Sequence, residues 1–340
     1  MDRDSLEAWA APHGEDSFAV VGLGGAGGDA VRDLVELGIP GVHAFAVNTD
    51  AKHLLGLPVE ERILLGHRQL RGRGSGGNRG LVLEAAEEGR EEMVRRLEHF
   101  DIVFLLAGLG GGTGSALLPF LSTALRKTDA LVVPVVFLPF KIELETNPER
   151  RLNVDETLHD LEEMGGLLLA LANEKLRRFD ALSLNRIFLL RNTYVHRLVT
   201  SLVDMVEHPS QLNVDLASLK SHLEDAGLST LLNAEYHVSE PERLVHQALT
   251  ETLLDFTLPE GPSALVHLDG GSNLTLQAIH RVLGTMQQRL GAPRRLILGT
   301  RYHPERREVI RLTAIVGGLK PLAIRQAMGG ASRPSPLPAR

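Results

Sequence analysis

Residues 108–115 read Gly108-Leu109-Gly110-Gly111-Gly112-Thr113-Gly114-Ser115 and join two very different stretches of sequence. The apolar run 101–107 before them is typical of a buried parallel strand, and 115–125 after them has the composition of a helix. A glycine-rich turn at that junction lets the backbone approach phosphate closely, while the helix start supplies free N–H groups. Because the turn lacks Lys, it is not the GxxxxGK[ST] loop of P-loop nucleotidases.

A second glycine loop, Gly22-Leu23-Gly24-Gly25-Ala26-Gly27, has the G-x-G-x-x-G spacing of dinucleotide-binding proteins. It lies between a predicted strand at 17–22 and a predicted helix at 29–37, and Asp50 follows 23 residues later. This loop alone leaves three alternatives open: a nicotinamide-dependent oxidoreductase, a generic phosphate site and a purely structural turn. Two such loops in one sheet exceed what a nicotinamide cofactor requires, so a different nucleotide is favoured.

The rest of the chain continues the alternation of strands and helices. Strands are predicted at 42–47 and 130–137, a helix at 81–98, and a long amphipathic helix from Leu184 to Val206. This pattern predicts a doubly wound parallel sheet with a ligand site at the carboxyl ends of its strands. Further on, strands are predicted at 263–268, 295–299 and 309–316, with a helix at 274–290, so we expect a smaller α+β domain there.

Composition limits the function classes. The 340 residues carry a net charge of −7 with 43% hydrophobic residues and no Cys, which indicates a globular protein without disulfides or thiolate metal sites. The longest strongly apolar stretch, 131–140, is half of the about 20 residues that a membrane-spanning helix needs, so we expect no membrane span and a cytoplasmic location. Mixed charges make nucleic acid an unexpected partner, although the Arg-rich loop 68–79 offers that alternative to a phosphate-side loop. No His pair has zinc-helix spacing, so no metal-ligating residues are predicted.

Several motifs together resemble the tubulin/FtsZ family. Residues 108–115 resemble its GGGTG signature, and 22–31 resemble the first phosphate loop of FtsZ. Other similarities follow in chain order: Ala46-Val47-Asn48-Thr49-Asp50 to AVNTD, Pro139-Phe140-Lys141-Ile142-Glu143 to PFxxE, Asn213-Val214-Asp215 to the NxD loop, and 270–276 and 310–314 to the C-terminal half. The similarity spans residues 17–320.

This resemblance implies an architecture and a ligand. The fold class would be α/β, with a Rossmann-like parallel-sheet GTP-binding domain at 17–183, a long central helix with the catalytic loop and helix at 184–227, and a smaller α+β C-terminal domain at 228–319. A flexible leader at 1–16 and a disordered basic tail at 320–340 would flank them. The ligand would be GTP or GDP with accompanying Mg²⁺, and copies of the chain would stack head to tail into protofilaments.

The resemblance also assigns residues to the nucleotide site. Glu143 would bind ribose, and Asn173 and Asn192 would bind guanine, whose edge an amide can read because it both donates and accepts. The residues near the phosphates would be Gly24, Gly25, Gly27, Asn48, Gly74, Ser75, Gly76, Gly77, Gly110, Gly111, Gly112, Thr113 and Gly114. Asn213 and Asp215 would act on the GTP held by the neighbouring subunit.

Three positions depart from the family pattern. Ser218 stands where FtsZ has the second carboxylate of NxDxxD, so we expect slow or absent GTP hydrolysis. Gly28 and Asp29 replace the common Asn-Asn, and Asp29 would bring a carboxylate close to phosphate. The family's arginine after Glu143 corresponds to Arg150 or Arg151. The leading hypothesis is an FtsZ-like cytoskeletal protein. The alternative is a non-hydrolysing GTP-binding regulator that caps or co-assembles with another FtsZ-like filament, and a role in cell division stays open.

Overall fold

The computed structural model describes residues 18–207, 214–256, 261–272, 274–291, 293–306 and 308–320, together with Ile324 and Met328. Their strands form one ten-stranded sheet in the order β3-β2-β1-β4-β5-β6-β7-β10-β8-β9. The leader 1–16 lies outside the described residues, as does the tail from 320 apart from Lys320 and the two residues above. The leader and tail therefore stay predictions.

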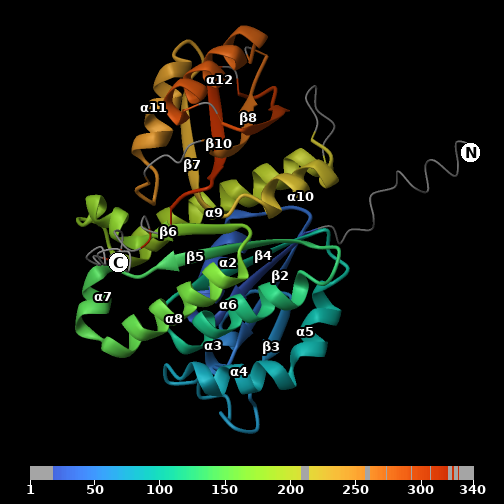
Figure 1. Ribbon diagram of the computed structural model, residues 1–340, viewed down its shortest axis with the longest axis vertical. Helices are drawn as coiled ribbons and strands as arrows, with labels where there is room; N and C mark the ends of the chain where they lie inside the picture. The colour runs from blue at the N-terminus through green and yellow to red at the C-terminus, as the bar shows by residue number, and fades with distance from the viewer. Residues whose placement is uncertain are drawn as a thin grey trace, which may run out of the picture.

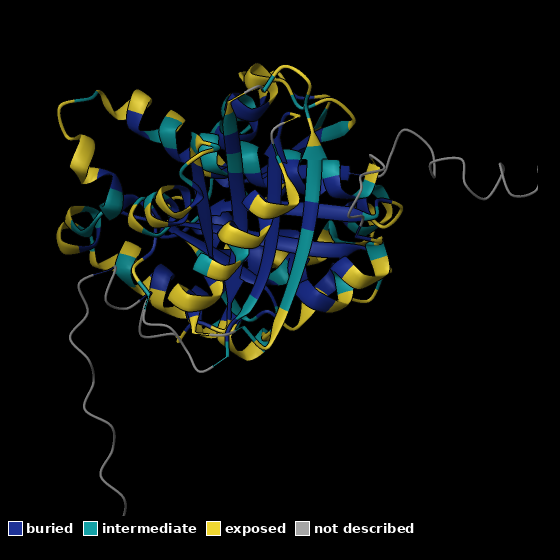
Figure 2. Cartoon of the chain, turned by 90° about the horizontal axis from the view of Figure 1, so that it is seen from above, coloured by how far each residue is buried: buried dark blue, intermediate teal, exposed yellow. Residues whose placement is uncertain are grey.

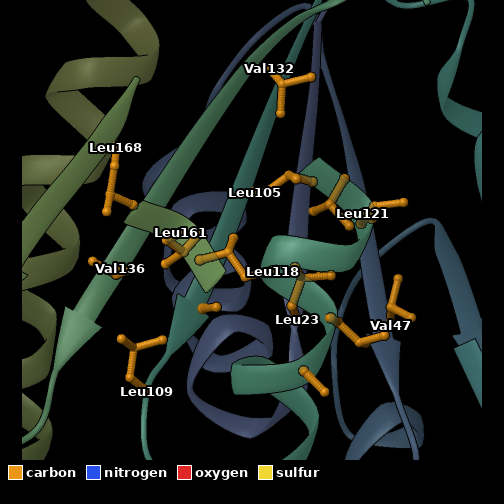
Figure 3. Packing of buried hydrophobic residues seen from close by; sticks show 14 of the residues in the cluster. Leu23, Val47, Leu105, Leu109, Leu118, Leu121, Val132, Val136, Leu161 and Leu168 are labelled. Atoms are coloured by element: carbon orange, nitrogen blue, oxygen red, sulfur yellow. The ribbon is translucent and has the colours of Figure 1, made fainter. Parts of the chain in front are cut away.

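The N-terminal half contains six parallel strands, and the sequence predicts some of them. These are β1 (Phe18–Leu23), β2 (Val42–Asn48), β3 (Glu61–Leu64), β4 (Ile102–Gly108), β5 (Leu131–Leu138) and β6 (Leu168–Ala172). Helices cover both faces, and one hydrophobic cluster fills each side. On the face drawn in Figure 3, Leu118 and Leu121 pack against strand residues such as Leu105 and Val132. The expected doubly wound parallel sheet is confirmed.

Among the described residues, nine α-helices and one 3-10 helix lie in this half and at its boundary. They are α2 (Gly24–Leu37), α3 (Ala51–Leu55), α4 (Arg79–Glu88), α5 (Arg90–Leu97), α6 (Gly112–Leu125), α7 (Lys141–Thr146), α8 (Pro148–Met164), the 3-10 helix η1 (Asn173–Phe179), α9 (Leu184–Glu207) and α10 (Leu216–Glu224). Two differ from the sequence prediction: α2 and α6 begin inside the glycine loops rather than after them. The predicted helix 81–98 is two helices, because the chain bends at Gly89.

The C-terminal half continues the sheet with β7 (Leu228–His237), β8 (Ser263–Gly270), β9 (Arg295–Tyr302) and β10 (Val309–Gly317). Helices α11 (Pro241–Thr250) and α12 (Leu276–Leu290) pack on one face of these strands. Helix α9 runs between the two halves (Figure 1), and seen from above the buried strands lie beneath partly exposed helices (Figure 2). The predicted long helix and smaller α+β domain are both present.

Two residues within the segment predicted as a tail are buried. Ile324 and Met328 are each 5% exposed and belong, with Leu319, to the hydrophobic cluster on the α4–α6–α8 face of the N-terminal sheet. The chain after β10 therefore returns to the N-terminal half. No helix among the described residues is both long and apolar enough to cross a membrane.

On the face of the C-terminal strands toward α9, charged residues of neighbouring strands lie side by side. Register pairs Arg311 with Glu235 on one side and with Asp269 on the other, and Asp269 with Arg301 beyond it. From α9, Arg197 Nη2 lies 3.9 Å from Glu235 Oε2.

His267 lies two residues before Asp269 on the same face of β8. It is 2% exposed, and its Nε2 has no hydrogen-bond partner among the described residues. Burial, together with the nearby cations Arg301, His303 and Arg311, lowers the pKa of His267 to about 3.

Because the His267 imidazole is buried in its neutral form, we expect the free energy of unfolding to fall in mild acid. A neutral His with a folded pKa of about 3 and an unfolded pKa of about 6.5 makes the unfolded state bind more protons as pH falls below 6.5. Between pH 7 and pH 5 the apparent free energy of unfolding should fall by about 2 kcal/mol through this group. Urea unfolding of wild type and His267→Gln at both pH values measures it, because the variant keeps every other titrating group. Equal pH dependence in the two proteins would contradict the assignment.

Candidate functional site

The two glycine loops meet at the carboxyl ends of adjacent strands. Leu23 at the end of β1 pairs with Ala107 near the end of β4, and a Cβ built on Gly24 would lie 2.9 Å from the backbone N of Gly114. Helices α2 and α6 start here, each 14 residues long, and neither N-cap residue provides a side-chain acceptor for the first-turn N–H groups. Two uncapped helix starts facing one place form an anion-binding site.

The glycines differ in what surrounds them. A Cβ on Gly27 would lie 2.1 Å from the carbonyl oxygen of Leu106, and one on Gly112 would lie 2.8 Å from the carbonyl carbon of Gly77. These glycines allow segments of backbone to pass each other. By contrast, a Cβ on Gly25 or Gly111 would meet nothing within 4 Å. Their backbone therefore borders open space that a ligand can occupy.

A third loop, Gly74 to Gly77, joins the first two. The ideal Cβ of Gly112 would be 2.3 Å from Ser75 Oγ, so this loop lies directly on the start of α6. Asn153 on α8 fastens the contact, because its Nδ2 donates to the carbonyl of Gly77 at 2.9 Å and to that of Gly110 at 3.2 Å. Sequence reasoning missed Asn153, since nothing local marks a helical Asn as a bridge between two distant loops.

The Asn48-Thr49-Asp50 turn reaches the same place through Thr49. The Thr49 and Thr113 hydroxyls are 2.9 Å apart and buried. Asn48 is buried as well, and its Oδ1 accepts hydrogen bonds from the backbone N of Thr49 and Asp50 at 2.8 and 3.3 Å. Asn48 thus shapes the turn and does not line the cavity described next.

A cavity of about 610 Å³ extends from the glycine loops along the edge of the sheet. Its size lies in the range of pockets that hold small organic ligands. Four of the site residues expected from sequence line it: Gly111, Glu143, Asn173 and Asn192. The wall also includes Asp29, Arg32, Asp33, Arg150, Phe188 and Arg191.

Glu143 lines the cavity and is held in place on both oxygens. Its Oε1 accepts a hydrogen bond from the backbone N of Phe140 at 3.0 Å, and its Oε2 pairs with Arg150. Of the two arginines that the sequence offered, Arg150 lines the cavity and Arg151 does not.

Arg191 also lines the cavity and is 3% exposed. Its guanidinium carbon lies 3.7 Å from the centre of the Phe137 ring, a cation–π contact, and it donates to the side-chain oxygens of Asn173 and Asn192. Burial lowers the pKa of Arg191 to about 9, which leaves it charged at pH 7. Sequence reasoning missed this cation because an Arg within an amphipathic helix is ordinarily solvated.

Asp29 does not present an unpaired carboxylate to the phosphate end. Its Oδ1 lies 2.8 Å from Arg32 Nη1 and 3.4 Å from His53 Nε2. The proximity of His53 and Arg32 lowers the pKa of Asp29, and Asp29 in turn raises the pKa of His53. The Arg32 guanidinium thereby offsets the charge that the sequence placed beside the loop.

The loop that the resemblance assigns to hydrolysis is described only in part, because Asn213 lies outside the described residues. Asp215 is the N-cap of α10, and both its oxygens are occupied by one residue: Oδ1 accepts from the backbone N of Ser218 at 2.8 Å and Oδ2 from its Oγ at 2.7 Å. The Ser218 hydroxyl lowers the pKa of Asp215, so the carboxylate is ionised at neutral pH. The chain therefore offers one carboxylate here, already engaged in capping.

Known proteins are similar to this chain in sequence and in structure. Residues 17–180 match the Tubulin/FtsZ family, GTPase domain, and residues 236–320 match the FtsZ family, C-terminal domain. The cell division protein FtsZ of Methanothermobacter thermautotrophicus is 32% identical over 92% of this chain and 82% of its own length. A solved FtsZ dimer of M. jannaschii superimposes with a TM-score of 0.79 at 30% identity, covering 94% of this chain and 93% of that one.

A more distant structure shares the fold alone. CetZ2 from Haloferax volcanii, solved as a GTPγS-bound protofilament, has a TM-score of 0.76 at 22% identity, and the match covers 92% of this chain and 96% of that one. Family matches thus cover both halves of the molecule, on either side of α9. With its GTPase domain, FtsZ-type C-terminal domain and identity of about 30% to archaeal FtsZ proteins, the chain belongs to the tubulin/FtsZ family of cytoskeletal GTPases.

Proposed function

We propose that the protein binds GTP or GDP at the carboxyl ends of β1, β4 and β5 and assembles head to tail into protofilaments that hydrolyse GTP slowly. The observation that carries this proposal is the meeting of two uncapped helix starts beside the open glycines Gly25 and Gly111. Charged oxygens of a nucleotide fit such a place because the N–H groups and both helix dipoles favour negative charge.

The other contacts with the nucleotide are proposed from the family resemblance and from which residues line the cavity. Glu143, held by Arg150, would bind the ribose hydroxyls, and Asn173 would contact the base. Phosphates would lie along Gly24, Gly25, Gly27 and residues 110–114, with the γ-phosphate toward residues 74–77. Mg²⁺ would accompany the nucleotide, bound to its phosphate oxygens.

Slow hydrolysis is supported by the Asp215–Ser218 pair. Hydrolysis in this family would need the NxD loop of one subunit to polarise water against the nucleotide of the next, and here that loop offers one carboxylate committed to a helix cap. The same observation favours a second candidate function, a non-hydrolysing regulator that caps or co-assembles with another FtsZ-like filament. Since relatives are named as cell division proteins, we place either activity in the cytoplasm of a dividing cell.

The test follows polymer and phosphate in one reaction. With GTP and Mg²⁺ the purified protein should form pelletable polymer while releasing little phosphate, and GDP should support less polymer because it lacks the γ-phosphate that would contact residues 74–77. Sedimentation combined with a phosphate assay measures both. Tight GTP binding without polymer would favour the regulator, and absence of GTP binding would refute the proposed site.

A further inference from the structure

Residues 75–77 belong to a tight turn, and their backbone N–H groups have no acceptor among the described residues. The turn is closed by a hydrogen bond of 3.1 Å from the N–H of Asn78 to the carbonyl of Ser75. Its two central residues, Gly76 and Gly77, have positive φ values of 60° and 93°, which glycine adopts without strain. Successive free N–H groups in a turn can bind an anion.

One side chain ties this turn to the rest of the site. Asn153 Nδ2 donates to the carbonyl of Gly77 at 2.9 Å and to the carbonyl of Gly110 at 3.2 Å. Asn153 is 5% exposed, so both hydrogen bonds lie largely out of reach of water. Because one amide donates to both loops, it fixes the distance between the turn and the glycine loop that precedes α6.

The two carbonyl groups depend on Asn153 to different degrees. Gly110 is held a second time, because its N–H donates to Ser115 Oγ at 2.9 Å. For Gly77, Asn153 is the one hydrogen-bond partner among the described residues. Loss of the Asn153 amide should therefore release the turn at 75–77 and leave the glycine loop in place.

We propose that Asn153 is a positioning residue that gives the nucleotide site a preference for GTP over GDP. This inference rests on the proposed nucleotide site, in which residues 74–77 would lie toward the γ-phosphate. Both donors of the Asn153 amide are used within the protein, so Asn153 acts through the turn and does not bind the nucleotide itself. A γ-phosphate would gain charge-assisted hydrogen bonds from the N–H groups of a turn that is already ordered, whereas GDP lacks the group that would reach them.

The test compares the affinities of the full chain for GTP and GDP. Competition against a fluorescent GDP analogue, below the protein concentration at which polymer forms, gives the dissociation constant of each nucleotide. Asn153→Ala should reduce the preference for GTP by about tenfold, because losing a hydrogen bond changes an equilibrium by up to about that factor. Nearly all of the change should lie in the affinity for GTP.

Thr157→Val is the matched control on the same helix. Thr157 is buried one turn further along α8, and its Oγ1 donates to the carbonyls of Ser115 at 3.0 Å and Asn153 at 2.6 Å. The variant thus loses buried hydrogen bonds but keeps the amide of Asn153, so its preference for GTP should equal that of wild type. Asn153→Asp is the second variant: it keeps the volume of the side chain, but an ionised carboxylate cannot donate to either carbonyl, so the preference should fall at least as far as in Asn153→Ala.

Hydrogen exchange shows where the effect arises. In wild type, GTP should slow the exchange of the amides at 75–77 more than GDP does, and Asn153→Ala should remove this difference while either nucleotide still protects the amides at 24–28. Thermal unfolding verifies that each variant is folded, and Asn153→Asp replaces Asn153→Ala if the latter is not.

The inference is overturned if the folded Asn153 variants keep the wild-type preference, if Thr157→Val loses it equally, or if GTP and GDP protect residues 75–77 alike in wild type. A wild type that binds neither nucleotide would instead refute the proposed site itself, so the two failures are distinguished.

Discussion

Gly27→Ala is expected to destabilise the protein by about 4 kcal/mol or more, enough to prevent folding of a chain with ordinary stability. The added Cβ would lie 2.1 Å from the carbonyl oxygen of Leu106 and 3.1 Å from its carbonyl carbon. Both atoms belong to β4, which is paired with β1 on one side and β5 on the other, so the strand cannot move aside. Urea denaturation, or the soluble yield if no folded protein is obtained, measures the effect.

Gly25→Ala is the matched control two residues away in the same helix. Its Cβ would meet nothing within 4 Å, and Ala in place of a helical Gly adds about 0.5–1 kcal/mol of stability. The same methyl group would project into the space assigned to phosphate, so affinity for GTP should fall while the fold is kept. If Gly27→Ala were as stable as Gly25→Ala, the close packing of α2 on β4 would be refuted.

Ser218→Asp is expected to accelerate phosphate release from GTP by on the order of ten- to a hundredfold, because it restores a second carboxylate that can orient or activate water. The backbone N of residue 218 would still donate to Asp215, so the helix cap stays in place. Phosphate release measured above the concentration at which polymer forms tests this, since the loop would act on a neighbouring subunit.

Ser218→Ala separates two reasons for slow turnover. It removes the Oγ hydrogen bond to Asp215 Oδ2 without adding charge. If the missing carboxylate limits the rate, the Ala variant stays slow while the Asp variant is fast. Equal acceleration in both would instead attribute slow turnover to the engagement of Asp215 by the Ser218 hydroxyl. A wild type that already releases phosphate rapidly would contradict the premise.

Much of the fold could be predicted because its signals are local. Continuous apolar runs predicted β1, β4 and β5, and the amphipathic stripe that includes Val195, Leu198 and Leu202 predicted α9 almost to the residue. Strand β6 was missed because Leu168-Leu169-Ala170-Leu171-Ala172 consists of good helix formers and is a strand through its pairing with the neighbouring strands β5 and β7. The glycines at the start of α2 and α6 also concealed where those helices begin.

The site was predictable where a motif carries it and not where distant side chains meet. The glycine loops and Glu143 belong to short motifs, and Gly111 and Glu143 do line the cavity. The hydrogen bond between Asp33 and Asn192 spans 159 positions, and no local pattern indicates that an acidic residue on one helix orients an amide on another. The family resemblance was correct and located the site. It did not predict the hydrogen bonds that hold the side chains of the site in place.

The return of the chain after β10 limits how the C-terminal half can move. That half is attached to its neighbour where α9 and α10 lead into β7, and again where Leu319, Ile324 and Met328 enter the hydrophobic cluster of the N-terminal half. Because the C-terminal half is attached where the chain enters it and again where the chain leaves it, it is more restrained than it would be on a single linker. Within the sheet the two halves meet at β6 and β7, where two residue pairs join them among the described residues, and Leu231, Leu265 and Ile315 add a packed contact with the cluster around α9.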